Sequence, residues 1–364
     1  MESDEKSSLD FTACWGGISL CGLGAQGNAV GPCDKGEEEL KTAMKIYSDT
    51  PFGELALRHL KSGIGSHELI FPEVMAKSVL GQSVAGPGIR NVDIIFGQPD
   101  VSAVLEASRL RWMHVSTAGY TRYDHADFRK EMESRGVVVT NSSSVYADAC
   151  VEHFMTFLFS QSRQLLPNLA SNCANGSKEW FDLRESAIPL CGQRLVILGY
   201  GTIAKRLIEC LKPFKMDIVA MRRNPRGDES VTIVTPSDLD QSLGEADHVL
   251  NILPDNDESY HYVDESLLSK IKRGSVFYNI GRGRTVEQQA LASALHSGHL
   301  AAAWLDVTDP EPLPPEHPLR LAANCHITPH TAGGHQAESE TLVRHFLTNL
   351  NRFQQNQPLF DRII

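Results

Sequence analysis

Three side chains suited to acid–base and anion chemistry follow short apolar runs in the second half of the chain. Arg282 follows SVFYNIG, Glu311 follows LDVTDP, and His330 closes HITPH. If these runs are parallel strands, the three side chains meet at the carboxyl edge of one sheet, where ligands collect in α/β folds. Arginine can hold a carboxylate and polarise a carbonyl, while histidine can protonate a developing alkoxide. A nearby carboxylate orients the imidazole and favours its protonated form, so the trio suits reduction of a 2-keto acid by hydride.

Each member of this trio has an ordinary alternative when it is taken alone. Arg282 could be a surface arginine, Glu311 a loop residue and His330 a capped histidine. The catalytic interpretation is favoured because all three fall at strand ends in one region, and that region also carries a nucleotide motif.

The nucleotide motif is LVILGYGTIAKRL, in which Gly199, Gly201 and Ala204 fill the pattern G-x-G-x-x-G/A between an apolar run and a helical segment. The first glycine permits the tight turn, the second lets a pyrophosphate approach the backbone, and the small third residue lets the helix pack on the strand. The phosphates then meet free N–H groups at the helix start, around Thr202 and Ile203. The motif therefore predicts a dinucleotide site.

The next strand ends in DIVAMRRNPRGD, with Arg222 and Arg223 where an acid would select NAD. An acid at this position bonds the ribose 2′-hydroxyl and repels a 2′-phosphate, whereas guanidinium groups suit phosphate. We therefore expect NADP to be preferred, with NAD as the other coenzyme. The alternative is that these are ordinary surface arginines at a strand end.

The elements that position these residues form two series of β-branched runs alternating with amphipathic segments. This alternation predicts an α/β protein with two Rossmann-like or flavodoxin-like parallel-sheet domains and a cleft between them. The length of 364 residues also suits two domains. We expect a long helix at 146–165 to lead into the second series and the last helix to return to the first domain. The expected substrate domain is 45–145 plus 334–364, and the expected dinucleotide-binding domain is 146–333.

Residues 1–44 are expected to form a disordered or accessory tail rich in Gly, Ser and acidic residues. They contain a second G-x-G-x-x-G, formed by Gly22, Gly24 and Gly27. We reject it as a dinucleotide loop, because Gly31-Pro32 interrupts the helix that should follow and no βαβ unit fits there.

Composition narrows the class of protein further. The formal net charge of −11 argues against a nucleic-acid partner, and no run of about 18 apolar residues indicates a membrane segment. The acidic start MESDEKSSLD does not look like a basic targeting signal, so we expect a cytoplasmic protein. The eight cysteines lack metal or disulfide spacing, so no metal is expected.

With these motifs in place, the chain resembles the D-isomer-specific 2-hydroxyacid dehydrogenase family over about 45–360. The segment VILGYGTIAKRL looks like the family's nucleotide loop, VFYNIGRGRTVEQQAL its arginine motif, AAWLDVTDPEPLPPEHPL its glutamate motif and ITPHTAGG its histidine motif. The resemblance implies that Arg282, Glu311 and His330 are catalytic. It also implies a homodimer paired through the nucleotide domain.

The resemblance further implies the contacts of substrate and coenzyme. The segment HVSTAGYTRYD is similar to the loop that holds the substrate carboxylate, which points to Thr117, Ala118 and Gly119, together with Arg282 and His330. The expected coenzyme contacts, with Asp306 at the nicotinamide carboxamide, are Gly199, Tyr200, Gly201, Thr202, Ile203, Arg222, Arg223, Leu253, Pro254, Ile280, Gly281 and Asp306.

We expect an NAD(P)-dependent enzyme that reduces a small 2-keto acid such as glyoxylate or hydroxypyruvate to the D-2-hydroxy acid. Two alternatives stay open. One is a dehydrogenase of a larger or phosphorylated acid such as phosphoglycerate, for which Arg90 and Arg122 are candidate anion contacts. The other is a non-enzymatic, corepressor-like protein that senses the dinucleotide. Fold alone does not distinguish these activities.

Overall fold

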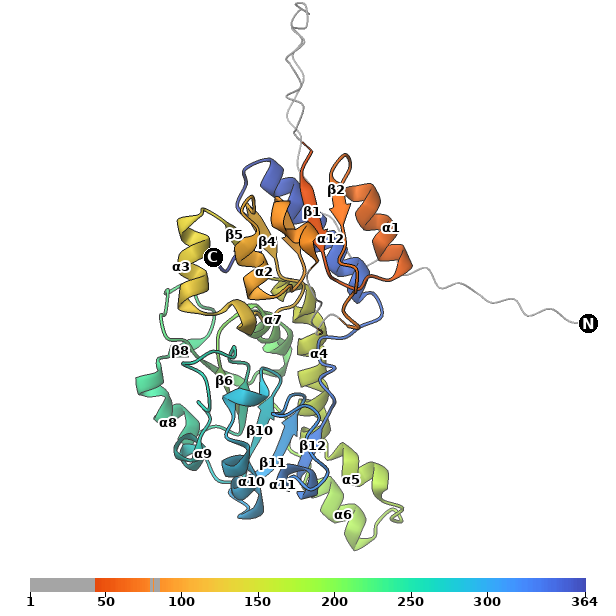
Figure 1. Cartoon of the computed structure of the whole chain (residues 1–364). Helices are drawn as coiled ribbons and strands as arrows, with labels where there is room; N and C mark the ends of the chain where they lie inside the picture. Colours follow the sequence, from red (N-terminus) through yellow and green to blue (C-terminus); the bar gives the residue numbers. More distant parts are fainter. Residues whose placement is uncertain (1–42, 79–80, 82–85) are drawn as a thin grey trace, which may run out of the picture. The chain divides into compact units, whose positions relative to one another are not determined.

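The computed structural model describes residues 43–78, 81 and 86–364. The expectations for the tail, and for the G-x-G-x-x-G that it contains, concern residues that lie almost entirely outside this part. The described residues contain two parallel sheets with helices packed around them (Figure 1).

The first sheet has the strand order β2-β1-β3-β4-β5, and all its neighbouring strands are parallel. This is the flavodoxin-like order, in which the connections change direction beside the first strand. Its strands are β1 (Lys45–Ser48), β2 (Glu68–Ile70), β3 (Ile94–Phe96), β4 (Trp112–His114) and β5 (Val138–Thr140).

The second sheet has the order β12-β11-β10-β9-β6-β7-β8, and its strands are again parallel. The chain moves outward from β6 through β7 to β8 and then resumes on the other side at β9, which is the Rossmann topology with one added strand. Its strands are β6 (Arg194–Leu198), β7 (Asp217–Met221), β8 (Thr232–Val234), β9 (His248–Asn251), β10 (Ser275–Asn279), β11 (Leu300–Leu305) and β12 (Cys325–Ile327).

The helices follow the alternation that the sequence predicts. They are α1 (Glu54–Gly63), α2 (Val101–Glu106), α3 (Ala126–Ser134), α4 (Ser143–Ser162), α5 (Leu165–Ala170), α6 (Lys178–Glu185), α7 (Thr202–Leu211), α8 (Leu239–Gly244), α9 (Glu265–Lys270), α10 (Gln288–His296), α11 (Pro318–Leu321) and α12 (Glu338–Gln354).

The central strands are buried throughout and mostly apolar because helices cover both faces of each sheet. Every residue of β10, sequence SVFYN, is buried, and so is every residue of β3. Strands covered on both faces read as continuous apolar runs rather than alternating ones. This is why the runs in the sequence predict a parallel sheet and why their carboxyl ends define one edge.

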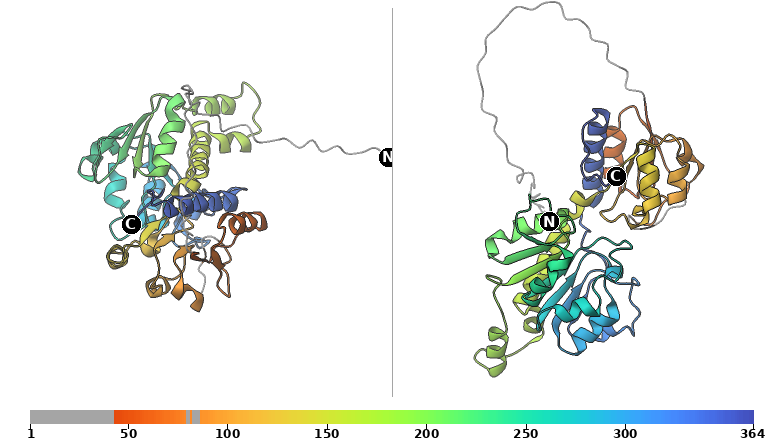
Figure 2. Two further views of the ribbon diagram at one scale, coloured as in Figure 1. Left: turned by 90° about the horizontal axis from the view of Figure 1, so that it is seen from above. Right: turned by 90° about the vertical axis from the view of Figure 1, so that its left-hand side faces the viewer.

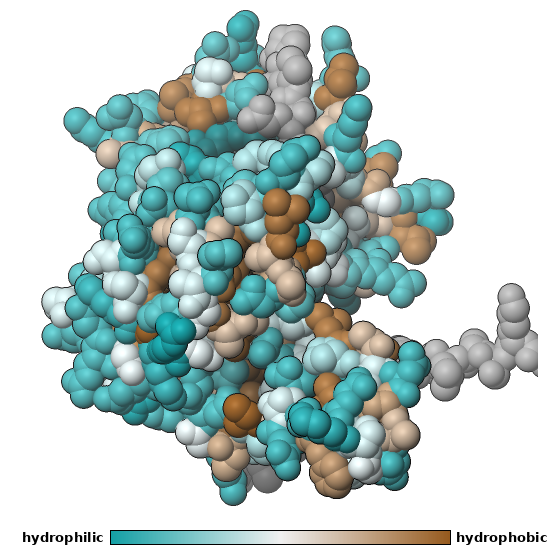
Figure 3. Space-filling model, turned by 90° about the horizontal axis from the view of Figure 1, so that it is seen from below, coloured by the Kyte–Doolittle hydropathy of each residue, from teal (hydrophilic) through white to brown (hydrophobic). Residues whose placement is uncertain are grey.

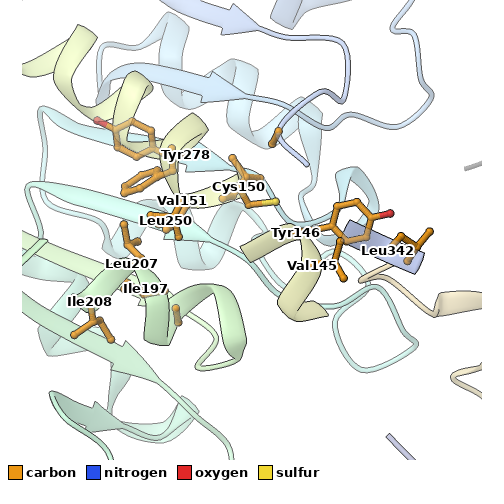
Figure 4. Close-up of a cluster of buried hydrophobic side chains, with 14 of the residues drawn as sticks. Val145, Tyr146, Cys150, Val151, Ile197, Leu207, Ile208, Leu250, Tyr278 and Leu342 are labelled. Atoms are coloured by element: carbon orange, nitrogen blue, oxygen red, sulfur yellow. The ribbon is translucent and has the colours of Figure 1, made fainter. Parts of the chain in front are cut away.

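Helix α4 joins the cores of the two sheets. Its residues Val145, Tyr146 and Val151 belong to one buried cluster that also includes Ile197 of β6 and Leu342 of α12. Figure 4 shows this cluster, with Leu342 beside the first turns of α4 and Leu207 and Ile208 of α7 at the other end.

Helix α12 lies beside elements of the first sheet although it is the last helix of the chain (Figure 2, right). It packs against α1, and its Phe346 stacks on Phe96 and Trp112 with ring centroids 4.1 and 5.1 Å apart. This packing supports the predicted return of the last helix, while the domain boundaries at 145/146 and 333/334 stay predictions.

The structure differs from the sequence-based expectations at three places in the second series. The long helix runs from Ser143 to Ser162 rather than over 146–165, because Gln164 takes a left-handed conformation with φ 50°. Helices α5 and α6 then follow, which the sequence did not indicate. Strand β8 was also missed: it is an edge strand of only three residues, Thr232–Val234, without a fully buried position.

Two features would change the class of protein, membrane-spanning helices and clusters of metal-binding side chains, and the described residues hold neither. None of their helices has the length and apolar character needed to cross a membrane. No group of three or more His, Cys, Asp or Glu side chains among them could hold a metal ion.

Candidate active site

His330 and Glu311 form a hydrogen-bonded pair at the carboxyl edge of the second sheet. The Nδ1 atom of His330 lies 2.8 Å from Oε2 of Glu311, and the backbone N–H of Thr308 donates to Oε1 at 3.0 Å. Partial burial by itself would raise the pKa of Glu311, but the hydrogen bonds from His330 and Thr308 lower it below its usual value. The carboxylate therefore stays charged and holds the imidazole with Nε2 free to face a substrate.

Asp306 fixes the backbone that carries His330. Its carboxylate accepts hydrogen bonds from the Thr328 hydroxyl at 2.6 Å and from the backbone N–H groups of Thr331 and Ala332, each at 2.9 Å. Its carbonyl accepts from the N–H of His330 at 2.9 Å. His330 has φ 55°, so these contacts hold it in a conformation that few non-glycine residues adopt. The expected contact of Asp306 with a carboxamide stays a prediction.

Arg282 lies against the loop that the sequence predicted to hold the substrate carboxylate. A side-chain Cβ built at Gly119 would overlap its guanidinium group, so a larger residue there would displace Arg282. Burial lowers the pKa of Arg282 below its usual value, while the charges of Asp255 and Glu311 oppose this shift. The structure thus brings a desolvated guanidinium to Thr117, Ala118 and Gly119 of the first sheet.

These groups line one small cavity of about 150 Å³. Thr117, Ala118, Gly119, Arg282 and His330 are all in its wall, as the sequence predicted. Glu311 is not in the wall, but it contacts His330, and its charge also acts on Arg282.

The same wall contains three residues that lie outside every motif of the sequence analysis. Tyr146 and Cys150 come from α4, and Glu338 comes from the first turn of α12. The Tyr146 hydroxyl lies 3.1 Å from Oε1 of Glu338 and 2.9 Å from the Ser116 carbonyl. Burial raises the pKa of the Cys150 thiol to about 12, so the thiol is protonated and serves as an apolar lining. No spacing in the sequence links α4 to α12, so no sequence signal could have found this pair.

A second cavity of about 250 Å³ adjoins the first and contains the nucleotide motif. Its wall includes most of the expected coenzyme contacts: Gly199, Tyr200, Gly201, Thr202, Ile203, Leu253, Pro254, Ile280 and Gly281. Gly199 has φ 118°, and a Cβ at Gly201 would meet no atom within 4 Å, so the second glycine leaves open space above the start of α7. Ala118, Gly119 and Arg282 line both cavities. The residues of this second cavity therefore fit a dinucleotide, and the cavity shares Arg282 with the first.

Arg222 and Arg223 lie outside this second cavity, beyond the end of β7. Arg222 donates to Oε1 of Glu229 at 2.8 Å, and its guanidinium lies 5.7 Å from the ring centroid of Tyr200. Arg223 forms an ion pair with Glu258 and lines a neighbouring cavity of about 830 Å³. Both arginines are therefore paired with carboxylates of this chain, and their expected contact with the coenzyme stays a prediction.

Comparison with known proteins places the chain in a family. The family model described as D-isomer specific 2-hydroxyacid dehydrogenase, NAD binding domain, matches residues 155–332. A glyoxylate reductase from Aeropyrum pernix is 32% identical over 254 residues, which are 67% of this chain and 72% of the relative. A glyoxylate/hydroxypyruvate reductase B from Erwinia tasmaniensis is 29% identical over 275 residues, which are 73% of this chain and 78% of the relative.

A solved structure shares the fold. It is an NADPH-dependent glyoxylate/hydroxypyruvate reductase from Sinorhizobium meliloti in complex with NADP and malonate. It matches with a TM-score of 0.66 at 24% identity, covering 88% of this chain and 97% of that one.

The chain belongs to the D-isomer specific 2-hydroxyacid dehydrogenase family. It is accordingly an oxidoreductase that uses a nicotinamide dinucleotide, and the predictions of the α/β class, the enzyme class and the coenzyme class are confirmed. The individual roles of the site residues and the choice of keto acid are taken up below as proposals.

Proposed function

We propose that the enzyme reduces a small 2-keto acid, such as glyoxylate or hydroxypyruvate, to the D-2-hydroxy acid. The observation that carries this proposal is the single cavity in which Arg282, His330 and the loop at Gly119 meet beside the nucleotide cavity. The names of the relatives, a glyoxylate reductase and a glyoxylate/hydroxypyruvate reductase, support the same substrate class.

In this proposal, Arg282, His330 and Glu311 each have a separate role in the reduction. The bound coenzyme supplies the hydride. Arg282 holds the substrate carboxylate and polarises the keto oxygen, with the backbone at Ala118 and Gly119 as a second support. His330 donates a proton from Nε2 to the oxygen on which negative charge develops. Glu311 stabilises the protonated imidazole through its contact at Nδ1.

The cavity favours a substrate with a short, uncharged side chain. Its volume is about 150 Å³, and Glu338 adds a carboxylate to its wall. A second anionic group on the substrate would be repelled there. Arg90 and Arg122, the candidate phosphate contacts, line neither this cavity nor the nucleotide cavity, because Arg90 pairs with Glu106 and Arg122 donates to the Gln98 carbonyl. This argues against a phosphorylated acid.

We further propose that NADPH is the preferred coenzyme, because Arg222 and Arg223 stand at the end of β7 where an acid would select NADH. The Sinorhizobium meliloti enzyme of similar fold is described as NADPH-dependent. Since both arginines are already paired with carboxylates, we expect a preference rather than exclusion of NADH.

The test is a panel of glyoxylate, hydroxypyruvate, pyruvate, phenylpyruvate and a phosphorylated 2-keto acid, each with NADPH and NADH. We expect the highest kcat/KM with glyoxylate or hydroxypyruvate, and about ten- to a hundredfold higher kcat/KM with NADPH than with NADH. Faster reduction of the phosphorylated acid would favour the alternative substrate class. Absence of turnover with every acid would favour the corepressor-like alternative. A protein that only senses the dinucleotide would not need the pairing of His330 with Glu311.

We also propose that the protein is a homodimer. Helices α5 and α6 extend from the C-terminal end of α4 (Figure 1). Large apolar side chains are exposed on them and just after them: Leu169 of α5 is 72% exposed, Phe181 of α6 is 49% exposed, and Ile188 after α6 is 61% exposed. The face shown in Figure 3 is mostly hydrophilic, with hydrophobic residues in separate clusters. Exposed apolar groups gathered on one short segment mark contact surfaces. The cytoplasmic location stays a prediction.

For the dimer we expect sedimentation equilibrium to give twice the mass of the chain, and we expect Leu169→Glu with Phe181→Glu to give the monomer. Glu substitutions at the exposed Leu55 and Val74, away from α5 and α6, are the control. A monomeric unmodified protein would contradict the proposal.

A further inference from the structure

The loop between β7 and β8 contains an anion site that is already filled by a side chain of this chain. The carboxylate of Glu229 accepts hydrogen bonds from the backbone N–H groups of Arg226 at 2.8 Å and Gly227 at 2.7 Å. The guanidinium of Arg222 donates to the same carboxylate at 2.8 Å. Two converging backbone N–H groups and a guanidinium are the donors that bind a phosphate equally well.

The two paired side chains of this anion site are largely covered although the loop itself is exposed, and the site is tied to the nucleotide loop. The side chain of Glu229 is only 4% exposed, and that of Arg222 is 19% exposed. The next residue, Ser230, donates its backbone N–H to the Tyr200 hydroxyl at 3.2 Å, and Tyr200 lies between the two glycines of the nucleotide motif. The hydrogen bonds from the Arg226 and Gly227 backbone hold the pKa of Glu229 below its usual value, so it carries a full negative charge.

We propose that Glu229 occupies the anion site that a 2′-phosphate would take, and that it thereby limits the preference of this enzyme for NADPH. The inference rests on the proposed use of Arg222 for coenzyme selection. It assigns that selection to a pair of opposed residues, in which Arg222 attracts the phosphate and Glu229 competes with it.

The two coenzymes meet this pair differently. A 2′-phosphate needs the donors that Glu229 now uses, and two anions at one site repel each other, so Glu229 must leave before NADPH can bind through Arg222. NADH carries a hydroxyl at the same position and can leave Glu229 in place as an acceptor. Glu229 therefore supplies, from the loop, the acid that is absent from the end of β7.

The experiment measures dissociation constants of NADPH and NADH by fluorescence titration of the full-length protein, without a keto acid. We expect Glu229→Gln, which keeps an oxygen acceptor for the loop but removes the charge, to bind NADPH about tenfold more tightly. Binding of NADH should be unchanged or weaker. Glu229→Asp keeps the charge and should not tighten NADPH binding. Glu265→Gln, which removes one charge on α9 outside both cavities, should leave both constants unchanged.

Three results would overturn the inference: NADPH binding that is unchanged or weaker in Glu229→Gln, equal tightening for both coenzymes, or equal tightening in Glu229→Asp. If the Gln protein does not fold, Glu229→Ser gives the same comparison, because a hydroxyl can still accept from the loop N–H groups. The readout does not depend on turnover. A failure of the keto-acid panel therefore leaves this test intact, and a failure here leaves the proposed reaction intact.

Discussion

Replacing His330 with Gln is expected to lower kcat for the keto acid by about two to four orders of magnitude, which is what positioned general acid catalysis contributes. Glutamine fills a similar volume and can still bond to Glu311, so the loop held by Asp306 should keep its conformation. The amide cannot release a proton to the developing alkoxide. NADPH binding should therefore persist in fluorescence titrations while single-turnover reduction slows.

The chain offers a matched control for this variant. His335 lies on the same loop, is exposed and lines neither cavity, so His335→Gln should leave kcat unchanged. If His330→Gln turns over at the normal rate, His330 is not the proton donor. If His330→Gln loses both turnover and NADPH binding, the substitution has disturbed the loop. The contacts of Thr328 and Asp306 are then to be checked by determining the structure of the variant.

The proximity of Arg282, Glu311 and His330 could be predicted from sequence because one physical rule covers all three positions. Arg282, Glu311 and His330 follow β10, β11 and β12, which are adjacent strands of one parallel sheet. The carboxyl ends of such strands meet at one edge, so sequence position alone predicts proximity. That the strands are parallel and covered on both faces likewise follows from their apolar runs, whereas the strand order of each sheet comes only from the structure.

Residues placed by tertiary packing could not be predicted in this way. Glu338 reaches the substrate cavity only because α12 packs on the first sheet, which sets its first turn beside Tyr146 of α4. From the sequence alone, Glu338 is an ordinary acidic residue at the start of a helix. The helix dipole favours acidic residues at this position, so a glutamate there indicates no site.

The coenzyme site shows a second limit of the sequence. In the run MRRNPRGDES, the residues directly after β7 are arginines, and the acidic residues come only later in the loop. The conformation of the loop then brings Glu229 back onto Arg222. Gly227 has φ 80°, a left-handed conformation that glycine adopts freely. The glycine allows this turn of the loop, but its presence in the sequence does not show that the turn forms. The sequence therefore shows which charges are available, but the fold decides how they pair.

Arg282→Lys is expected to lower kcat/KM for the keto acid by about two to three orders of magnitude, comparable to losing a donor from an oxyanion hole. The loss should appear both as a higher KM and as a lower kcat. An ammonium group cannot form two parallel hydrogen bonds to a carboxylate, and it cannot polarise the keto oxygen at the same time. Burial makes the loss larger, because the low exposure that lowers the pKa of Arg282 also strengthens its attraction for a substrate anion.

The neighbouring glycine provides an independent check on Arg282. Because a Cβ at position 119 would overlap the guanidinium, Gly119→Ala should displace Arg282 without removing it and should raise KM in the same direction. Arg284→Lys is the matched control, since Arg284 is exposed and its guanidinium lies over the Tyr260 ring, 5.1 Å from the centroid. If KM is unaltered in both Arg282→Lys and Gly119→Ala, Arg282 does not hold the substrate carboxylate. If only Gly119→Ala raises KM, the backbone of the loop at Gly119 holds the carboxylate instead.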